Sequence, residues 1–250
     1  KGHQRIIQGM KEKATEMGGR SMLVTFEPHP LKLLNQKAFP GLLTTTGEKL
    51  RFLEGCLIDE VFVILFDNKV ADTPPAVFIR EWIVEKTGVS SIIMGYDHSF
   101  GKNRSGSENL LFKLGKEHDF SVSVVEPVKI GGKNVSSTLI RSLVYEGRVS
   151  EAAKLLGRNY RLSGRVVRGN ALGVKIGFPT ANIKMKTEEK IVPGNGVYAA
   201  LAHVEDMTYK SMLNIGYRPT FGGEERTIEV HLHQFGGDLY HKEINVEFVK

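Results

Sequence analysis

Thr180 and Asn182 are the residues whose types and spacing most clearly suggest chemistry. They lie in Gly177-Phe178-Pro179-Thr180-Ala181-Asn182-Ile183, and Gly169 and Gly173 precede that run at intervals of four. Glycine allows a backbone to approach a ligand closely. The Thr hydroxyl and the Asn carbonyl are hard oxygen donors, which Mg²⁺ prefers when it also holds phosphates. The segment therefore predicts a glycine flap leading into a metal and phosphate contact. A β-turn with proline at its corner is the alternative.

A second run, Ser136-Ser137-Thr138-Leu139-Ile140-Arg141, enters a predicted helix. Its hydroxyls and the backbone N–H groups of a helix N-terminus would form an anion site. Arg141, one turn into the helix, could hold a phosphate through its bidentate fork. Simple capping by serine explains the pattern equally well. Gly2-His3 shifts the balance toward an anion site, because a histidine opening a helix can donate to phosphate oxygens as charge develops. By itself, His3 is more typical of a surface histidine.

Glu229 is the candidate general base of the second half of the chain. It lies in Arg226-Thr227-Ile228-Glu229-Val230-His231 and alternates with Ile228 and Val230. Its side chain should therefore point away from theirs on a strand, where a cleft-facing carboxylate could accept a proton. The strand pattern alone favours the alternative, a glutamate facing solvent on an edge strand.

The composition indicates a globular protein that handles small anionic molecules. The chain has 250 residues, 41% of them hydrophobic and 25% charged, enough for one large or two ordinary domains. Neither an apolar run long enough for a membrane span nor a signal peptide is visible in the sequence. The single cysteine, Cys56, fits a reducing cytosol. The net charge of +6 is scattered, which suits nucleotides better than nucleic acid. The oligomeric state stays open.

The periodicity changes once along the chain. Short apolar runs alternate with helix-length stretches up to about residue 125, which predicts a Rossmann-like parallel sheet. The runs are Ser21–Phe26, Glu60–Phe66, Ser91–Met94 and Ser121–Val125. Two short helices broken near Gly147 follow, with Ser150 expected to cap the second. After Gly157, strand-like runs separated by turns predict an antiparallel barrel or sandwich. We expect two domains, 1–155 and 156–250. Because the helix Gln4–Met17 precedes any strand, we also expect a strand before Lys1.

In these motifs the chain resembles the bacterial bifunctional riboflavin kinase/FAD synthetases. The resemblance covers essentially the whole chain in the family's order. Lys1-Gly2-His3 matches the end of a longer run with glycines and histidines that family members carry before the first helix. The family's Phe-x-Pro-His-Pro and Ser-Ser-Thr-x-x-Arg motifs are intact. The matching runs are Phe26–Pro30, Ser136–Arg141, Phe178–Asn182, Asn214–Gly222, Thr227–His231 and Asp238–Tyr240. Val174 stands where many relatives have arginine, and the family's C-terminal helix is not in this sequence.

The resemblance implies two ATP-dependent reactions and assigns residues to each. The barrel would phosphorylate riboflavin to FMN with Glu229 as base, Thr180 and Asn182 as Mg²⁺ and phosphate ligands, and Gly169 to Gly177 as a flap over ATP. The first half would adenylylate FMN to FAD, and its residues follow here: His3, Ser136, Ser137, Thr138 and Arg141 for the triphosphate, Asp97 at the nucleotide or metal end, and Phe26 and His29 for the flavin. His29 could equally order the loop between its two prolines.

The resemblance also implies small-molecule partners, no nucleic acid or membrane partner, and a cytoplasmic location. Two other functions stay open. One is a riboflavin kinase with a degenerate first half. The other is a flavin-binding regulator, although a sensor would not need Glu229 as a base. ATP consumption on adding riboflavin separates the regulator from the enzyme.

Overall fold

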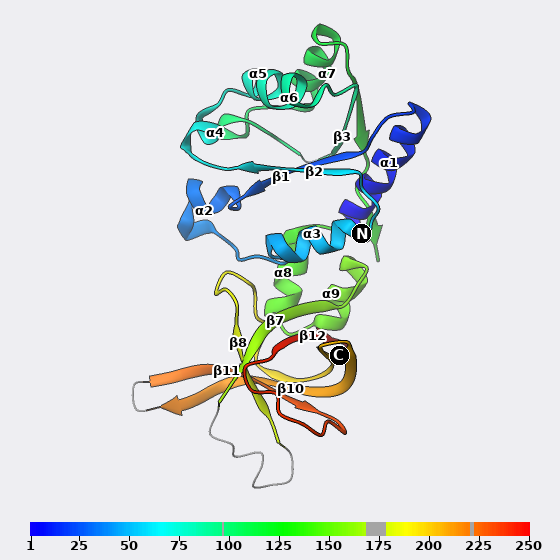
Figure 1. The fold of residues 1–250 in the computed structure, drawn as a ribbon. Helices are drawn as coiled ribbons and strands as arrows, with labels where there is room; N and C mark the ends of the chain where they lie inside the picture. The colour runs from blue at the N-terminus through cyan, green and yellow to red at the C-terminus, as the bar shows by residue number, and fades with distance from the viewer. Residues whose placement is uncertain (97, 169–178, 221–222) are drawn as a thin grey trace. The chain divides into compact units, whose positions relative to one another are not determined.

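The computed structural model describes residues 1–96, 98–168, 179–220 and 223–250 and divides into two compact units (Figure 1). The first unit comprises Lys1–Pro40 and Thr44–Val135, and the second comprises Gly41–Leu43 and Ser136–Lys250. Each unit has its own core, as expected for domains of this size.

The first unit is built on parallel strands covered by helices, which confirms the predicted α/β class. β1 (Met22–Glu27) pairs in parallel with β2 (Glu60–Leu65), and β3 (Ser91–Gly95) pairs in parallel with β4 (Ser121–Val125), as two separate ladders. A short hairpin, β5 (Lys129–Ile130) and β6 (Lys133–Asn134), follows. The helices are α1 (Gly2–Glu16), α2 (Pro30–Leu34), η1 (Gln36–Ala38), α3 (Thr46–Glu54), α4 (Asn68–Asp72), α5 (Pro75–Phe78), η2 (Ile79–Val84), α6 (Glu85–Thr87), η3 (Lys102–Arg104) and α7 (Glu108–Glu117).

The core of this unit forms where helix faces cover the strands. Phe78, Ile79 and Ile83 are buried on one helical face, with Trp82 packed beside them, as their spacing predicts. Leu111 and Leu114 of α7 are also buried, and they join Ile64 and Met94 from the strands. The strands and helices of this unit therefore share one apolar core.

Two helices begin the main segment of the second unit. α8 (Ser137–Tyr145) and α9 (Val149–Leu156) are separated at Gly147, where φ is +76°. Val144, Val149 and Ala152 are buried to 1% exposure or less, and Gly194 N donates to Val144 O over 3.1 Å. Because the helices bury these residues within the barrel unit, contacts divide the chain after Val135. The change of periodicity had placed the boundary later, at 155/156.

The rest of the second unit is a closed antiparallel barrel, which confirms the second predicted class. Its strand order is β10-β11-β8-β7-β12-β9. Inward positions alternate with outward ones along each strand, and Leu162, Leu213, Val230 and Val246 are completely buried. The strands are β7 (Tyr160–Val167), β8 (Ala181–Met185), β9 (Gly196–Val204), β10 (Met207–Thr220), β11 (Gly223–Leu232) and β12 (Glu243–Phe248).

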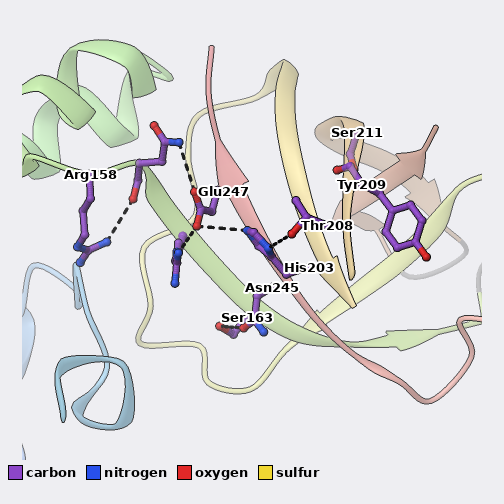
Figure 2. Close-up of polar contacts among 10 residues, drawn as sticks. Arg158, Ser163, His203, Thr208, Tyr209, Ser211, Asn245 and Glu247 are labelled. Carbon is purple, nitrogen blue, oxygen red and sulfur yellow. Dashed lines mark hydrogen bonds and ion pairs between the residues drawn. The ribbon is translucent and has the colours of Figure 1, made fainter. Parts of the chain in front are cut away.

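The outer face of β7, β12 and β9 carries a cluster of polar side chains (Figure 2). Arg161 of β7 is ion-paired with Glu247 of β12. His203 of β9 lies between Glu247 and Thr208, with Nδ1 2.9 Å from Thr208 Oγ1. Its Nε2 is 3.2 Å from Glu247 Oε1, within ion-pair distance but outside hydrogen-bond geometry. In the closed ring β12 is three strands from β11 in either direction, so this cluster lies on the opposite arc from the site described next.

Candidate active sites

A row of polar side chains crosses the outer face of β8, β11 and β10. Glu229 of β11 pairs in register with Asn182 of β8 on one side and with Asn214 of β10 on the other. Ile228 and Val230 are buried inside the barrel, so Glu229 faces outward, as the alternation predicts. Directly opposed antiparallel residues have Cβ atoms about 5 Å apart. The fold thus brings two predicted site residues side by side and adds Asn214, which no sequence signal had singled out as a site residue.

The Glu229 carboxylate is engaged at both oxygens. The Thr180 hydroxyl donates to Oε2 over 3.2 Å, and Arg218 Nη2 contacts Oε1. The side chain of Glu229 is 17% exposed and that of Arg218 is 25% exposed. Glu229 is therefore a largely buried, hydrogen-bonded carboxylate rather than a solvent-facing one on an edge strand. Thr180, Asn182 and Glu229, expected to act together, lie together.

Pro179 is fixed to the barrel just before these residues. His231 Nδ1 lies 2.9 Å from Pro179 O, and because a carbonyl oxygen only accepts, Nδ1 is the donor. His231 lies two residues beyond Glu229 on the same face of β11. It was predicted to be a strand surface residue, and its tether to the backbone before Thr180 was missed. Gly169, Gly173 and Gly177 lie outside the described residues.

The donors around Glu229 suit a magnesium ion that also holds phosphates. Thr180 supplies a hydroxyl oxygen next to the carboxylate, and Asn182 supplies an amide oxygen from the neighbouring strand. Hard oxygen donors and substrate phosphates are what Mg²⁺ takes in nucleotide sites. No group of three or more His, Cys, Asp or Glu side chains within the described ranges could hold a metal. Binding of Mg²⁺ at Thr180 and Asn182 stays a prediction.

The start of α8 carries the second set of predicted residues. Ser136 is the N-cap, and its Oγ accepts from Leu139 N over 3.2 Å. Ser137 and Thr138 occupy the first turn. Arg141 is half-buried and donates from Nε to Gly41 O over 3.1 Å. Burial lowers the pKa of the Arg141 guanidinium below its usual range. Capping by Ser136 is thus real and uses Leu139 N, and Arg141 lies in the middle of the nine-residue helix, one turn beyond Ser137.

The remaining candidates belong to the first unit. His3 is exposed in the first turn of α1. Phe26 packs against Phe66 and Phe78, with ring centroids 5.3 and 6.0 Å apart. His29 caps α2, accepting from Leu31 N at Nδ1 over 3.2 Å, so it does order the loop. Asp97 lies outside the described residues.

Lys49 was missed by the sequence analysis. Its Nζ donates to Thr25 Oγ1 over 2.9 Å, near the carboxyl end of β1. Burial lowers the pKa of this ammonium, and the nearby Glu27 partly opposes the shift. Ligands of parallel sheets bind at this end of the strands. Lys49 lies one turn into α3, the helix that precedes β2, and no sequence motif marked it.

Comparison with known proteins identifies both units. Residues 1–139 match the family model for FAD synthetase, and residues 156–250 match that for riboflavin kinase. A bifunctional riboflavin kinase/FMN adenylyltransferase of Escherichia coli (strain K12) is 36% identical over 98% of this chain and 78% of its own length. The enzyme of the same name from Pseudomonas fluorescens is 33% identical over 99% of this chain and 79% of its own length.

A solved structure agrees in fold over the whole chain. It is described as a macrolide-efflux protein from Streptococcus pneumoniae, superposes with a TM-score of 0.89, is 29% identical, and covers 100% of this chain and 81% of its own. In the described part of this chain, no helix combines the length and apolar character needed to cross a membrane. Both family models and the curated relatives agree on one assignment, and the chain belongs to the family of bifunctional riboflavin kinase/FMN adenylyltransferases.

Proposed function

We propose that the barrel phosphorylates riboflavin at Glu229 and that the chain then adenylylates FMN, with the start of α8 as a phosphate site. In this proposal residues 156–250 form the kinase and residues 1–155 the adenylyltransferase. The observation that carries the kinase assignment is the placement of Glu229 beside Asn182 with a hydrogen bond from Thr180. A general base must lie within hydrogen-bond reach of the proton that it abstracts, and a hydroxyl aimed at a phosphate held by Thr180 and Asn182 would lie beside Glu229.

In the kinase reaction, Glu229 accepts the proton of the terminal ribityl hydroxyl. The hydroxyl oxygen then bonds to the γ-phosphorus of ATP, the bond to the β–γ bridging oxygen breaks, and ADP leaves with that electron pair. Thr180 and Asn182 orient the phosphates, and the glycine flap over ATP stays a prediction. Mg²⁺, when bound through Thr180 and Asn182, would neutralise charge on the transferring group.

In the adenylyl transfer, an FMN phosphate oxygen attacks the α-phosphorus of ATP and pyrophosphate leaves. The N–H groups of the first turn of α8, with Ser136, Ser137 and Thr138, bind phosphate oxygens. Arg141 stabilises the charge that develops on them, and the part of His3 in holding the triphosphate stays a prediction. Asp97 at the nucleotide end and Phe26 and His29 at the flavin end stay predictions. A small-molecule enzyme with one cysteine suits the cytosol, and we propose that location.

Two single substitutions test the assignment. Glu229→Gln keeps the size of the side chain but removes the base, so we expect kinase activity to fall by about 10²–10⁴-fold while FMN adenylylation is retained. Arg141→Ala should do the reverse. Flavins separated by chromatography after incubation with ATP and Mg²⁺, starting from riboflavin or from FMN, report each step. If either substitution impairs both steps equally in folded protein, the division of labour is wrong.

A further inference from the structure

Arg218 contacts the proposed base directly, although no motif assigns it a role. It lies on β10, the strand paired with β11, and its Nη2 reaches Glu229 Oε1. Exposed ion pairs contribute little because water screens them. With Arg218 25% and Glu229 17% exposed, this pair is mostly withdrawn from solvent, where losing one charge would leave the other uncompensated.

The two contacts define the position of the carboxylate. Arg218 holds Oε1 and the Thr180 hydroxyl holds Oε2, so the carboxylate plane is fixed from both ends. An ionised carboxylate has about four acceptor positions. These two donors therefore leave capacity for a substrate hydroxyl. The arrangement orients the base without blocking it.

The charges around Glu229 need the same arginine. The proposed reaction brings a triphosphate to Thr180 and Asn182, next to a largely buried carboxylate. Two neighbouring anions repel each other strongly in a poorly solvated site. The Arg218 guanidinium and the Glu229 carboxylate together carry no net charge. When Glu229 takes up the substrate's proton, the pair becomes positive while the transferring phosphoryl group carries negative charge.

We propose that Arg218 is a positioning residue of the kinase, which orients Glu229 and offsets its charge so that ATP can bind beside it. This inference rests on the proposed role of Glu229 as base. A purely structural role, in which Arg218 only joins β10 to β11, is the competing explanation. The positioning role and the structural role predict different effects of side-chain charge and shape at position 218 on ATP binding and on turnover.

Arg218→Met and Arg218→Lys separate charge from shape. We expect Arg218→Met to lower kcat by about 10–100-fold, the range for a misplaced catalytic group, and to raise KM for ATP. Lysine keeps the charge but lacks the planar fork, so Arg218→Lys should restore KM for ATP and leave kcat low. FMN adenylylation by the same proteins should stay at the wild-type rate and serves as the control for folding.

A matched control comes from the opposite arc of the barrel. Arg161 of β7 and Glu247 of β12 also form a cross-strand arginine–glutamate pair on the outer face. Arg161→Met removes that pair without touching Glu229, and we expect kinase kcat and KM to stay within about twofold of wild type, as for a substitution outside the site. The same loss in Arg161→Met and Arg218→Met would mean that the kinase responds to barrel stability, and would overturn the inference.

The double variant Glu229→Gln/Arg218→Met completes the test, with single-turnover rates measured at excess enzyme. If Arg218 acts through Glu229, its substitution should cost less than about twofold once the base is gone, because residues acting as a unit are not additive. An undiminished effect of Arg218→Met in that background overturns the inference. So does wild-type kinetics of Arg218→Met beside an inactive Glu229→Gln. A fully active Glu229→Gln would overturn the proposed base and the inference together.

Discussion

Gly41 shows how a single residue can be dictated by the space around it. Its φ is +74°, and a Cβ there would lie 2.8 Å from Ile191 Cγ1 and 3.2 Å from the Tyr145 hydroxyl. The same residue offers its carbonyl to Arg141. Position 41 therefore needs glycine for two reasons, a left-handed backbone and a close approach to Ile191 and Tyr145.

Gly41→Ala should destabilise the second unit. Overpacking of this kind costs about 1–3 kcal/mol, and in a chain of this size each kcal/mol lowers the unfolding midpoint by about 2–4 °C. Differential scanning calorimetry measures the shift. Gly132→Ala in the first unit is the control for backbone conformation, measured on the transition of that unit, since φ there is +76° and no atom lies within 4 Å of the added Cβ. Equal shifts in the two variants would show that backbone conformation, and not the contact with Ile191, requires the glycine.

At the scale of single residues, most of the predictions came from residue types. Thr180, Asn182 and Glu229 were chosen from motifs, and the barrel places them together because β8 and β11 pair in the register that sets Asn182 opposite Glu229. Arg218 and His231 were not given their roles, because their contacts depend on strand neighbours that the sequence does not name. Spacing along one strand says which face a side chain occupies, but not what lies across from it.

Individual elements were predicted well where an apolar run or a helical spacing of apolar residues marked them. The parallel strands and the two helices around Gly147 were predicted within a residue or two. β8 was missed, because Ala181–Met185 is short and was interpreted only as a turn or ligand contact. Ser150 was expected to cap α9, but its hydroxyl donates to Val249 O over 3.0 Å instead. Arg148 is the N-cap, without a side-chain cap. A tertiary contact thus replaced the local one.

The start of β1 depends on a carboxylate, which gives an acid-sensitive prediction. Asp59 Oδ2 accepts from Ser21 N over 2.8 Å and from Ser21 Oγ over 2.6 Å. These hydrogen bonds lower the pKa of Asp59 below its usual value. A carboxyl group with a lowered folded-state pKa stabilises the fold above its unfolded pKa of about 3.9, and loses that stabilisation as pH falls through the folded value.

Asp59→Asn should therefore be less stable than wild type at pH 7, and the difference should shrink below about pH 4. Urea unfolding monitored by the fluorescence of Trp82, which lies in the same unit, measures both limits. Asp119→Asn offers a comparison at another aspartate in this unit, for which no hydrogen bond to Ser21 exists. A stability difference that stays constant from pH 7 to pH 3 would contradict an electrostatic role for Asp59.

At the scale of the whole molecule, the sequence placed two folds in the right order but set their boundary by periodicity alone. Contacts assign α8 and α9, with the proposed phosphate ligands of the adenylyltransferase, to the same compact unit as the barrel. His3 and Phe26 belong to the other unit. Hydrophobic periodicity detects where the architecture changes. Contacts between residues, in contrast, show which segments are buried together. A helix of the first pattern can therefore pack with the second fold.

Separate sites for the two reactions predict that defective molecules can complement each other. Glu229→Gln should retain adenylylation and Arg141→Ala should retain the kinase, so neither alone should convert riboflavin to FAD. Mixed in equal amounts with ATP and Mg²⁺, they should form FAD after a lag in which free FMN accumulates, because product made on one molecule must diffuse to another. Adding FMN at the start should abolish the lag. If each variant performs its own step on added substrate but the mixture makes no FAD, the kinase variant does not release its FMN, and exchange of free FMN between molecules would be excluded.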